Sequence, residues 1–175
     1  MVMLKFYKLY PDVEVPGFAT CGSACFDLRA HLRGSPSVPA WDPENKSISL
    51  PVFFGMDPAP ITLTIPPLHR VSVPTGIIFD IPEGHSVRVH ARSGLALKQG
   101  LVMVNAQGIV DSDYVEESRL LMQNLSAAPI VIKHGDRIAQ AELVRDLEYS
   151  LDEITERPTQ KTTRAGGFGS TGVTQ

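Results

Sequence analysis

The sequence predicts an all-β protein, folded as a distorted jelly-roll-like β-barrel. Its 175 residues include 14 glycines and 14 prolines, which separate many short apolar runs. Short runs between turn residues, with little helical periodicity, are typical of strands in barrels and sandwiches. This length suits one domain with a sizeable core, and no internal repeat is apparent. The expected strands cover residues 5–9, 61–65, 76–81, 86–91, 119–124, 129–133 and 138–147.

Charge and composition exclude several classes of protein. The formal net charge of −3 and the pI near 5.9 do not support nucleic-acid binding, and the sequence has no basic stripe with interleaved aromatic residues. No nucleic-acid partner is therefore expected. We find neither a signal peptide nor a long apolar span, which predicts a soluble, cytoplasmic protein without a membrane partner. Cys21 and Cys25 are expected to be free thiols, because a zinc site would need two further ligands at suitable spacing.

The alternating run at 86–91 predicts a strand, and a short helix beginning near Ser93 follows it. The first turn of such a helix has unpaired backbone N–H groups, and Arg92 adds a positive charge beside them. This combination suits an anion such as phosphate. An ordinary serine N-cap beside a solvated arginine is the alternative.

Residues 104–114 place a short polar turn between apolar residues and end in two carboxylates and a tyrosine. Small or polar residues at a hairpin tip allow the backbone to approach a ligand. The apolar end of the hairpin then presents Asp111. A small-molecule site is therefore predicted, with a plain polar turn before an acidic loop as the alternative. The residues of interest are Asn105, Gly108, Val110, Asp111 and Tyr114.

Two further segments have weaker signals. Residues 135–140 form a turn that enters a strand. The Gly-rich tail at 164–172 contains one aromatic side chain, Phe168, and two hydroxyl groups. Such a tail cannot build a core, but its amides and hydroxyls could order on phosphates while Phe168 stacks on a base. A terminus without function is the alternative.

Together the segments resemble the five ordered motifs of the trimeric dUTPase (dUTP pyrophosphatase) family. The motifs correspond to residues 24–30, 91–96, 108–114, 135–140 and 166–172. Each is weak alone, but their order makes chance similarity improbable. The resemblance implies a homotrimer with shared active sites and a dUTPase-type barrel.

The resemblance also implies a division of the chain. Residues 1–152 would form the barrel domain, interrupted by an insertion at about 32–60. Residues 153–175 would form a C-terminal arm that closes over an active site. In the family this arm crosses to a neighbouring subunit.

The resemblance assigns roles to individual residues. Asp111 matches the general base that activates water for attack at the α-phosphorus of dUTP, which yields dUMP and pyrophosphate. Mg²⁺ is expected to enter on the triphosphate, with Asp27 near it through water. The residues expected to bind substrate are Arg92, Ser93, Gly94, Asn105, Gly108, Val110, Tyr114, Gln140, Arg164, Phe168, Gly169, Ser170 and Thr171.

Three features depart from the family pattern. Only Ala165 separates Arg164 from the paired glycines of the fifth motif, and Glu116 stands where the family commonly has glycine. The third departure is the insertion at 32–60, which is rich in proline. Its aromatic residues suggest that part of it packs, so a surface loop folded back on its own subunit is expected. A partner-binding element, or a cover for a neighbouring active site, are the alternatives. The aromatic residues are Trp41, Phe53 and Phe54.

Two other functions remain as alternatives. Deoxycytidine triphosphate deaminases share the expected architecture, but they depend on a glutamate at the pyrimidine ring, whereas this chain has the DSDY pattern at 111–114. A nucleotide-controlled regulatory binding protein, acting on a protein partner through the 32–60 insertion, is the second alternative.

Overall fold

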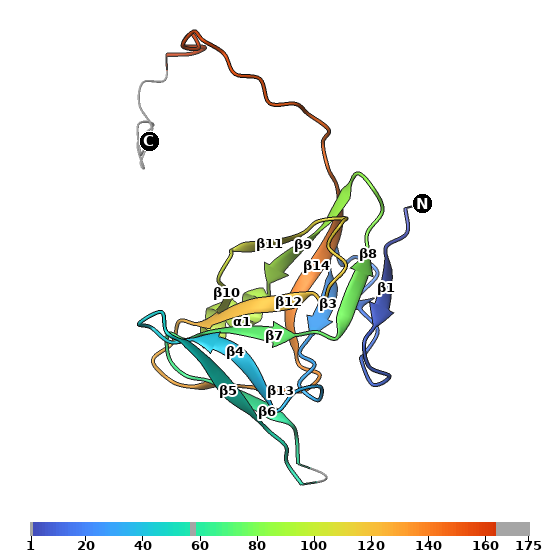
Figure 1. Ribbon diagram of the computed structural model, residues 1–175, viewed down its shortest axis with the longest axis vertical. Coiled ribbons are helices and arrows are strands. Elements are labelled where there is room, and N and C mark those ends of the chain that lie inside the picture. Colours follow the sequence, from blue (N-terminus) through green and yellow to red (C-terminus); the bar gives the residue numbers. More distant parts are fainter. Residues whose placement is uncertain (1, 57–58, 164–175) are drawn as a thin grey trace.

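The structure is a computed structural model that describes residues 2–56 and 59–163. It is almost entirely β, with one short helix in the described part of the chain (Figure 1). This confirms the predicted all-β, barrel-like fold. The elements are β1 (Lys5–Lys8), β2 (Gly17–Phe18), β3 (Phe26–Arg29), β4 (Ser37–Trp41), β5 (Ser47–Phe53), β6 (Thr62–Ile65), β7 (Arg70–Pro74), β8 (Ile77–Asp80), β9 (His85–Ala91), α1 (Ser93–Gln99), β10 (Leu101–Met103), β11 (Gln107–Val110), β12 (Arg119–Asn124), β13 (Ile130–Lys133) and β14 (Arg137–Arg145).

Three antiparallel sheets enclose the core. One has five strands in the order β11-β9-β14-β3-β2, the second has seven in the order β10-β12-β7-β4-β5-β6-β13, and β1 pairs with β8. Side chains alternate between the core and the outer surface, as the pleat of a strand requires. In β12, Leu120 and Met122 are buried while Arg119 and Leu121 face outward. The largest fully buried side chains include Phe79, Leu28, Leu32, Leu63, Ile65 and Leu101.

The segment at 32–60 is not a surface loop over most of its length. Its strands β4 and β5 form a hairpin that is built into the seven-stranded sheet, between β7 and β6. Val38 and Ala40 of β4, and Leu50 and Val52 of β5, are buried. The expectation of a loop was wrong here, because the prolines obscure a period-two pattern of apolar residues that is characteristic of strands.

The aromatic residues of the same segment do not provide its packing. Trp41, Phe53 and Phe54 are 39%, 56% and 53% exposed. The small and aliphatic side chains on the opposite face of the hairpin contact the core instead. The end of β5 and the start of β6 project from one end of the barrel, and the C-terminal segment projects from the opposite end (Figure 1).

The C-terminal segment leaves the barrel after β14. Residues 147–163 are exposed throughout, and they run away from the sheets as an extended chain (Figure 1). The predicted domain boundary near residue 152 therefore lies several residues beyond Arg145, the last residue of β14. The tail residues expected to bind substrate, Arg164, Phe168, Gly169, Ser170 and Thr171, lie outside the described residues.

Two smaller expectations can be compared with the structure. Cys21 is exposed and Cys25 partly buried, and both are free thiols. Within residues 2–56 and 59–163, no helix combines the length and apolar character needed to cross a membrane.

Candidate functional site

A hollow on the barrel gathers the residues predicted from the 104–114 segment. The segment contains the turn between β10 and β11, and then β11 itself, which pairs with β9 from Gln107↔His90 to Val110↔Val87. The expected hairpin was wrong, because β10 pairs with β12 in the other large sheet, so the turn joins two sheets instead of two paired strands. All five residues of interest line the same hollow, so the structure brings them together. The lining residues are Ser72, Val89, Met103, Asn105, Gly108, Ile109, Val110, Asp111, Tyr114, Ser118, Arg119 and Leu121.

Gly108 is closely packed at the wall of this hollow. A Cβ atom at this position would lie 3.2 Å from the Val89 Cβ, 3.3 Å from the Met103 Cε and 3.4 Å from the Asn105 Nδ2. The turn before it is made by Ala106, which adopts a φ of 55°. A larger residue at 108 would push Asn105 or the facing strand away and change the shape of the hollow.

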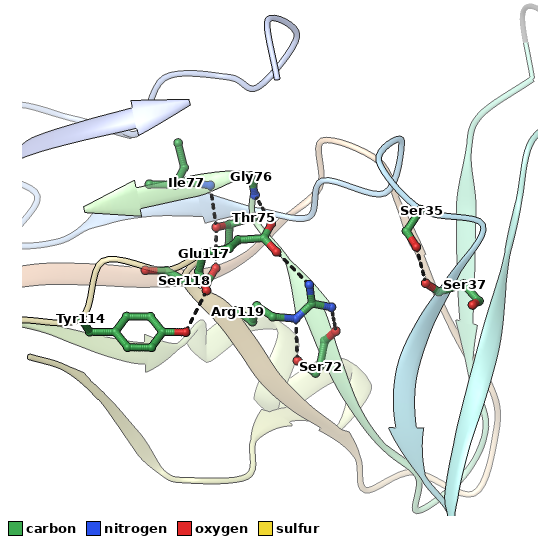
Figure 2. Close-up of polar contacts among 10 residues, drawn as sticks. All are labelled: Ser35, Ser37, Ser72, Thr75, Gly76, Ile77, Tyr114, Glu117, Ser118 and Arg119. Carbon is green, nitrogen blue, oxygen red and sulfur yellow. Dashed lines mark hydrogen bonds and ion pairs between the residues drawn. The ribbon is translucent and has the colours of Figure 1, made fainter. Parts of the chain in front are cut away.

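Asp111 and Tyr114 occupy a turn directly after β11. The Tyr114 N–H donates to the Asp111 carbonyl oxygen at 3.2 Å. The Tyr114 hydroxyl donates to the Glu117 carbonyl oxygen at 3.3 Å (Figure 2), and the side chain is 44% exposed. The Asp111 carboxylate is exposed and makes no hydrogen bond or ion pair with the described residues. This turn therefore presents an open carboxylate beside a ring that is anchored at its hydroxyl.

The residues predicted to bind phosphate form a separate cluster around Asp27 of β3. The Arg92 Nε lies 3.2 Å from Asp27 Oδ1, and the Arg137 Nη1 lies 3.0 Å from Asp27 Oδ2. Arg92 also donates to the Arg137 carbonyl oxygen at 2.9 Å. In β14, Gln140 pairs with Asp27 across the sheet and donates its side-chain amide to the Ala91 carbonyl oxygen at 3.2 Å. Arg137 therefore adds a second positive charge beside Arg92 in this cluster.

The short helix begins where the sequence predicted. Arg92 is its N-cap residue, with extended backbone and no side-chain cap, and Ser93 and Gly94 are exposed in its first turn. The serine-cap alternative is therefore wrong. At the other end Gly100 adopts a left-handed conformation, and its N–H caps the helix.

The two clusters lie at opposite ends of β9. Val87 pairs with Val110, the residue before Asp111, whereas Arg92 follows the other end of the strand, five residues further along. At the rise of a β-strand, this is a separation of roughly 17 Å. One chain therefore presents the open carboxylate and the paired arginines at two distinct places.

A third cluster was missed in the sequence. Asp12, His31 and His134 place their ligand atoms within 4.8 Å of one another. The His31 Nε2 lies 3.2 Å from Asp12 Oδ1, and the His134 Nε2 lies 3.6 Å from Asp12 Oδ2. These residues are far apart in the chain and have no motif spacing, so only the tertiary fold brings them together.

The hydrogen bonds of this cluster do not fit a metal. The Leu32 N–H donates to the His134 Nδ1 at 3.0 Å, which places the proton of the neutral ring on Nε2, the atom that faces Asp12. Burial lowers the pKa of His134, and the nearby His31 lowers it further. Burial alone would raise the pKa of Asp12, but the hydrogen bond and charge of His31 outweigh it and hold this pKa below its ordinary value. The cluster is therefore a network of donors around one carboxylate.

Comparison with known proteins agrees with this geometry. The dUTPase family model matches residues 58–172. Deoxyuridine 5'-triphosphate nucleotidohydrolase of Caulobacter vibrioides is 41% identical over 172 residues, covering 98% of this chain and 94% of the relative. The enzyme of the same name from Treponema pallidum is 38% identical over 170 residues and covers 94% of each chain.

Solved structures share the fold at low sequence identity. A mutant dUTPase of Staphylococcus bacteriophage 80alpha, solved with dUpNHpp, superposes with a TM-score of 0.74 at 18% identity, covering 99% of this chain and 100% of that one. The dUTPase of Streptococcus mutans has a TM-score of 0.62 at 21% identity, covering 83% and 98%.

Fold, site and relatives define an all-β enzyme that hydrolyses nucleotides. The family match covers four of the five motifs, and the relatives extend the similarity over nearly the whole chain. The chain belongs to the dUTPase family, whose reaction is the hydrolysis of dUTP to dUMP. This membership does not favour the deaminase alternative.

Proposed function

We propose that this chain hydrolyses dUTP to dUMP and pyrophosphate, with Asp111 as the general base. The hollow that gathers Asn105, Asp111 and Tyr114 is the observation that carries the proposal. A base positioned there can take a proton from water as the water attacks the α-phosphorus, in line with the leaving pyrophosphate. The product dUMP supplies thymidylate synthesis, and removal of dUTP limits uracil in DNA.

The hollow suits the nucleoside end of the substrate. Asn105 and the backbone of the turn around it would pair with uracil, and cytosine would leave mismatched polar groups. The Tyr114 ring would pack under the deoxyribose, where a 2′-hydroxyl would collide with it. Gly108 and Val110 would shape the wall of this pocket.

The cluster around Asp27 suits the phosphates. Arg92 offers a planar guanidinium, and the exposed residues Ser93 and Gly94 follow it in the first turn of α1. Gln140 would add a polar contact. The tail residues Arg164, Phe168, Gly169, Ser170 and Thr171 would close over the bound nucleotide.

Mg²⁺ would enter with the triphosphate. Both Asp27 oxygens already pair with guanidinium groups, so Asp27 would act on the ion only through water. Mg²⁺ prefers oxygen ligands and keeps several waters, a preference that phosphate oxygens satisfy. When bound, the ion would neutralise phosphate charge and favour one conformation of the chain of phosphates.

A homotrimer with shared active sites accounts for the distance along β9 between Asp111 and the arginines that pair with Asp27. The open carboxylate and the paired arginines of one chain are roughly 17 Å apart along the strand. Asp111 of one subunit would therefore act on a nucleotide whose phosphates bind Arg92 of another subunit. The exposed C-terminal segment after Arg145 is consistent with an arm that reaches a neighbour.

Pyrophosphate release from dUTP, dCTP, dTTP and UTP, with Mg²⁺ present or chelated, tests the proposal. We expect release from dUTP alone, dependent on the metal. Ammonia release from dCTP would instead support the deaminase alternative. Absence of pyrophosphate release from every nucleotide would reject the hydrolytic proposal.

A further inference from the structure

A network of polar contacts connects Tyr114, in the hollow that contains Asp111, to the turn between β7 and β8. Figure 2 shows the Tyr114 hydroxyl directed at Glu117, and Arg119 lying between Glu117 and Ser72. Of these four residues, Ser72, Tyr114 and Arg119 line the hollow. Glu117 does not line the hollow, and its side chain is only 18% exposed.

The Glu117 carboxylate is held at both oxygens. Its Oε1 accepts the Gly76 N–H at 2.8 Å, and its Oε2 pairs with the Arg119 Nη1 at 2.8 Å. Gly76 is buried and has a φ of +69°, and a Cβ there would lie 2.5 Å from the Val13 Cγ2. The backbone that receives Glu117 is therefore itself fixed by close packing.

Arg119 completes the attachment. Its Nε donates to the Ser72 Oγ at 2.9 Å and its Nη2 to the Ser72 carbonyl oxygen at 2.8 Å. All three guanidinium nitrogens therefore have partners within the barrel. Arg119 is a support for Glu117, although it also lines the hollow.

The backbone on either side of Glu117 is tied to the same turn. The Ser118 N–H donates to the Ile77 carbonyl oxygen at 2.8 Å, and the Thr75 hydroxyl donates to the Ser118 carbonyl oxygen at 2.6 Å. Between Tyr114 and these fixed residues lie only Val115 and Glu116, both exposed. Among the described residues, the Glu117 carbonyl oxygen is the hydrogen-bond partner that anchors the Tyr114 hydroxyl.

We infer that Glu117 is a positioning residue for Tyr114, and that it sets the discrimination between 2′-deoxyribose and ribose. The inference rests on the proposed function, in which the Tyr114 ring packs under the sugar. Without the Glu117 carboxylate, residues 115–118 are held less firmly against the turn between β7 and β8. The Tyr114 ring can then move aside and make room for a 2′-hydroxyl. The carboxylate itself does not touch the substrate.

The test compares two adjacent glutamates. Glu117→Ala and Glu117→Gln are measured beside Glu116→Ala and Glu116→Gln, which remove the same charge from an exposed side chain one residue away. The readout is the ratio of kcat/KM for dUTP to kcat/KM for UTP. We expect Glu117→Ala to lower this ratio about tenfold, the size of one coupled contact. Glu117→Gln keeps an acceptor for Gly76 but loses the ion pair, so a smaller decrease is expected, and the Glu116 variants keep the wild-type ratio.

A second background separates positioning from general weakening. In a Tyr114→Ala protein there is no ring to position, so adding Glu117→Ala leaves the ratio unchanged. Tyr114→Phe, which retains the ring but loses its hydroxyl anchor, lowers the ratio in the same direction as Glu117→Ala. If Glu117→Ala does not fold, Glu117→Gln and Tyr114→Phe provide the same comparison.

Two failures can be told apart. Wild-type protein that shows no preference for dUTP would reject the proposed function. Wild-type protein that prefers dUTP, with Glu117 variants that keep this preference, would reject only the positioning role. If Glu117→Ala changes the ratio equally in the Tyr114→Ala background and in the wild-type protein, the positioning role is also rejected.

Discussion

The Asp27 cluster and the Asp111 hollow are both carboxylate sites, but they are built in opposite ways. Asp27 is 14% exposed at its side chain, and each of its oxygens pairs with an arginine. The Asp111 carboxylate is exposed and has no polar partner among the described residues. A carboxylate held between two guanidinium groups orients them, whereas an open carboxylate can receive a proton. The comparison predicts binding at one cluster and chemistry at the other.

The largest effect should come from the open carboxylate. Asp111→Asn removes the proton acceptor while retaining the size of the side chain, so we expect kcat to fall about 10²- to 10⁴-fold with dUTP binding preserved. Single-turnover kinetics and nucleotide binding by calorimetry would measure this. Asp113→Asn is the matched control, since Asp113 is exposed and does not line the hollow. Retained activity in Asp111→Asn would remove this residue from the base role.

A smaller effect, on binding, should come from the paired arginines. Arg92→Ala removes a charged donor to phosphate, worth about 1.5–3 kcal/mol, so KM should rise about 10- to 100-fold with a smaller change in kcat. Lys133→Ala removes an exposed positive charge elsewhere on the barrel and should leave KM unchanged. A fall in kcat with constant KM would contradict the division between the two clusters.

The inserted hairpin offers a comparison of its own two faces. Leu50 is buried, so Leu50→Ala should lower the free energy of unfolding by about 2 kcal/mol or more. Phe53 lies on the exposed face, so Phe53→Ser should lower the free energy of unfolding by about 0.5 kcal/mol or less. Urea unfolding measures both. Equal effects would mean that the hairpin is not part of the core. Deleting residues 32–60 would remove buried side chains, so it does not isolate a partner-binding role.

The smallest effect concerns pH and the third cluster. The folded-state pKa of His134 lies below its ordinary value, so the unfolded chain takes up the proton more readily. The stability from the neutral ring is fully present above the ordinary histidine pKa of about 6.5 and is lost as the pH falls below it. The lowered pKa of Asp12 acts in the same direction at more acidic pH.

His134→Asn should reduce this dependence, because the asparagine oxygen can still accept the Leu32 N–H but does not titrate. His85→Asn serves as the control, since His85 lies outside the cluster. Thermal unfolding between pH 5 and 8 would measure the slopes. An unchanged slope in His134→Asn would show that this ring does not contribute.

Local sequence patterns predicted much of the fold. The expected strands at 86–91, 119–124 and 129–133 match β9, β12 and β13 to within a residue, and the short helix begins at Ser93. Alternating apolar residues and turn residues are local signals, so they can be recognised without knowing the partner strands. The hairpin β4–β5 was missed because Pro39 and Pro51 suggested a loop, although both lie on the exposed face of strands.

The sequence by itself determined the all-β class, the position of the turn and strand that present Asp111, and membership of the expected family. Only the tertiary structure decided which charges are already paired, as for Asp27, and which remain open, as for Asp111. Pairing depends on strand register, which joins Asp27 to residues more than sixty positions away. The same holds for the support of Tyr114 by Gly76 through Glu117, because no local pattern specifies contacts made across a barrel.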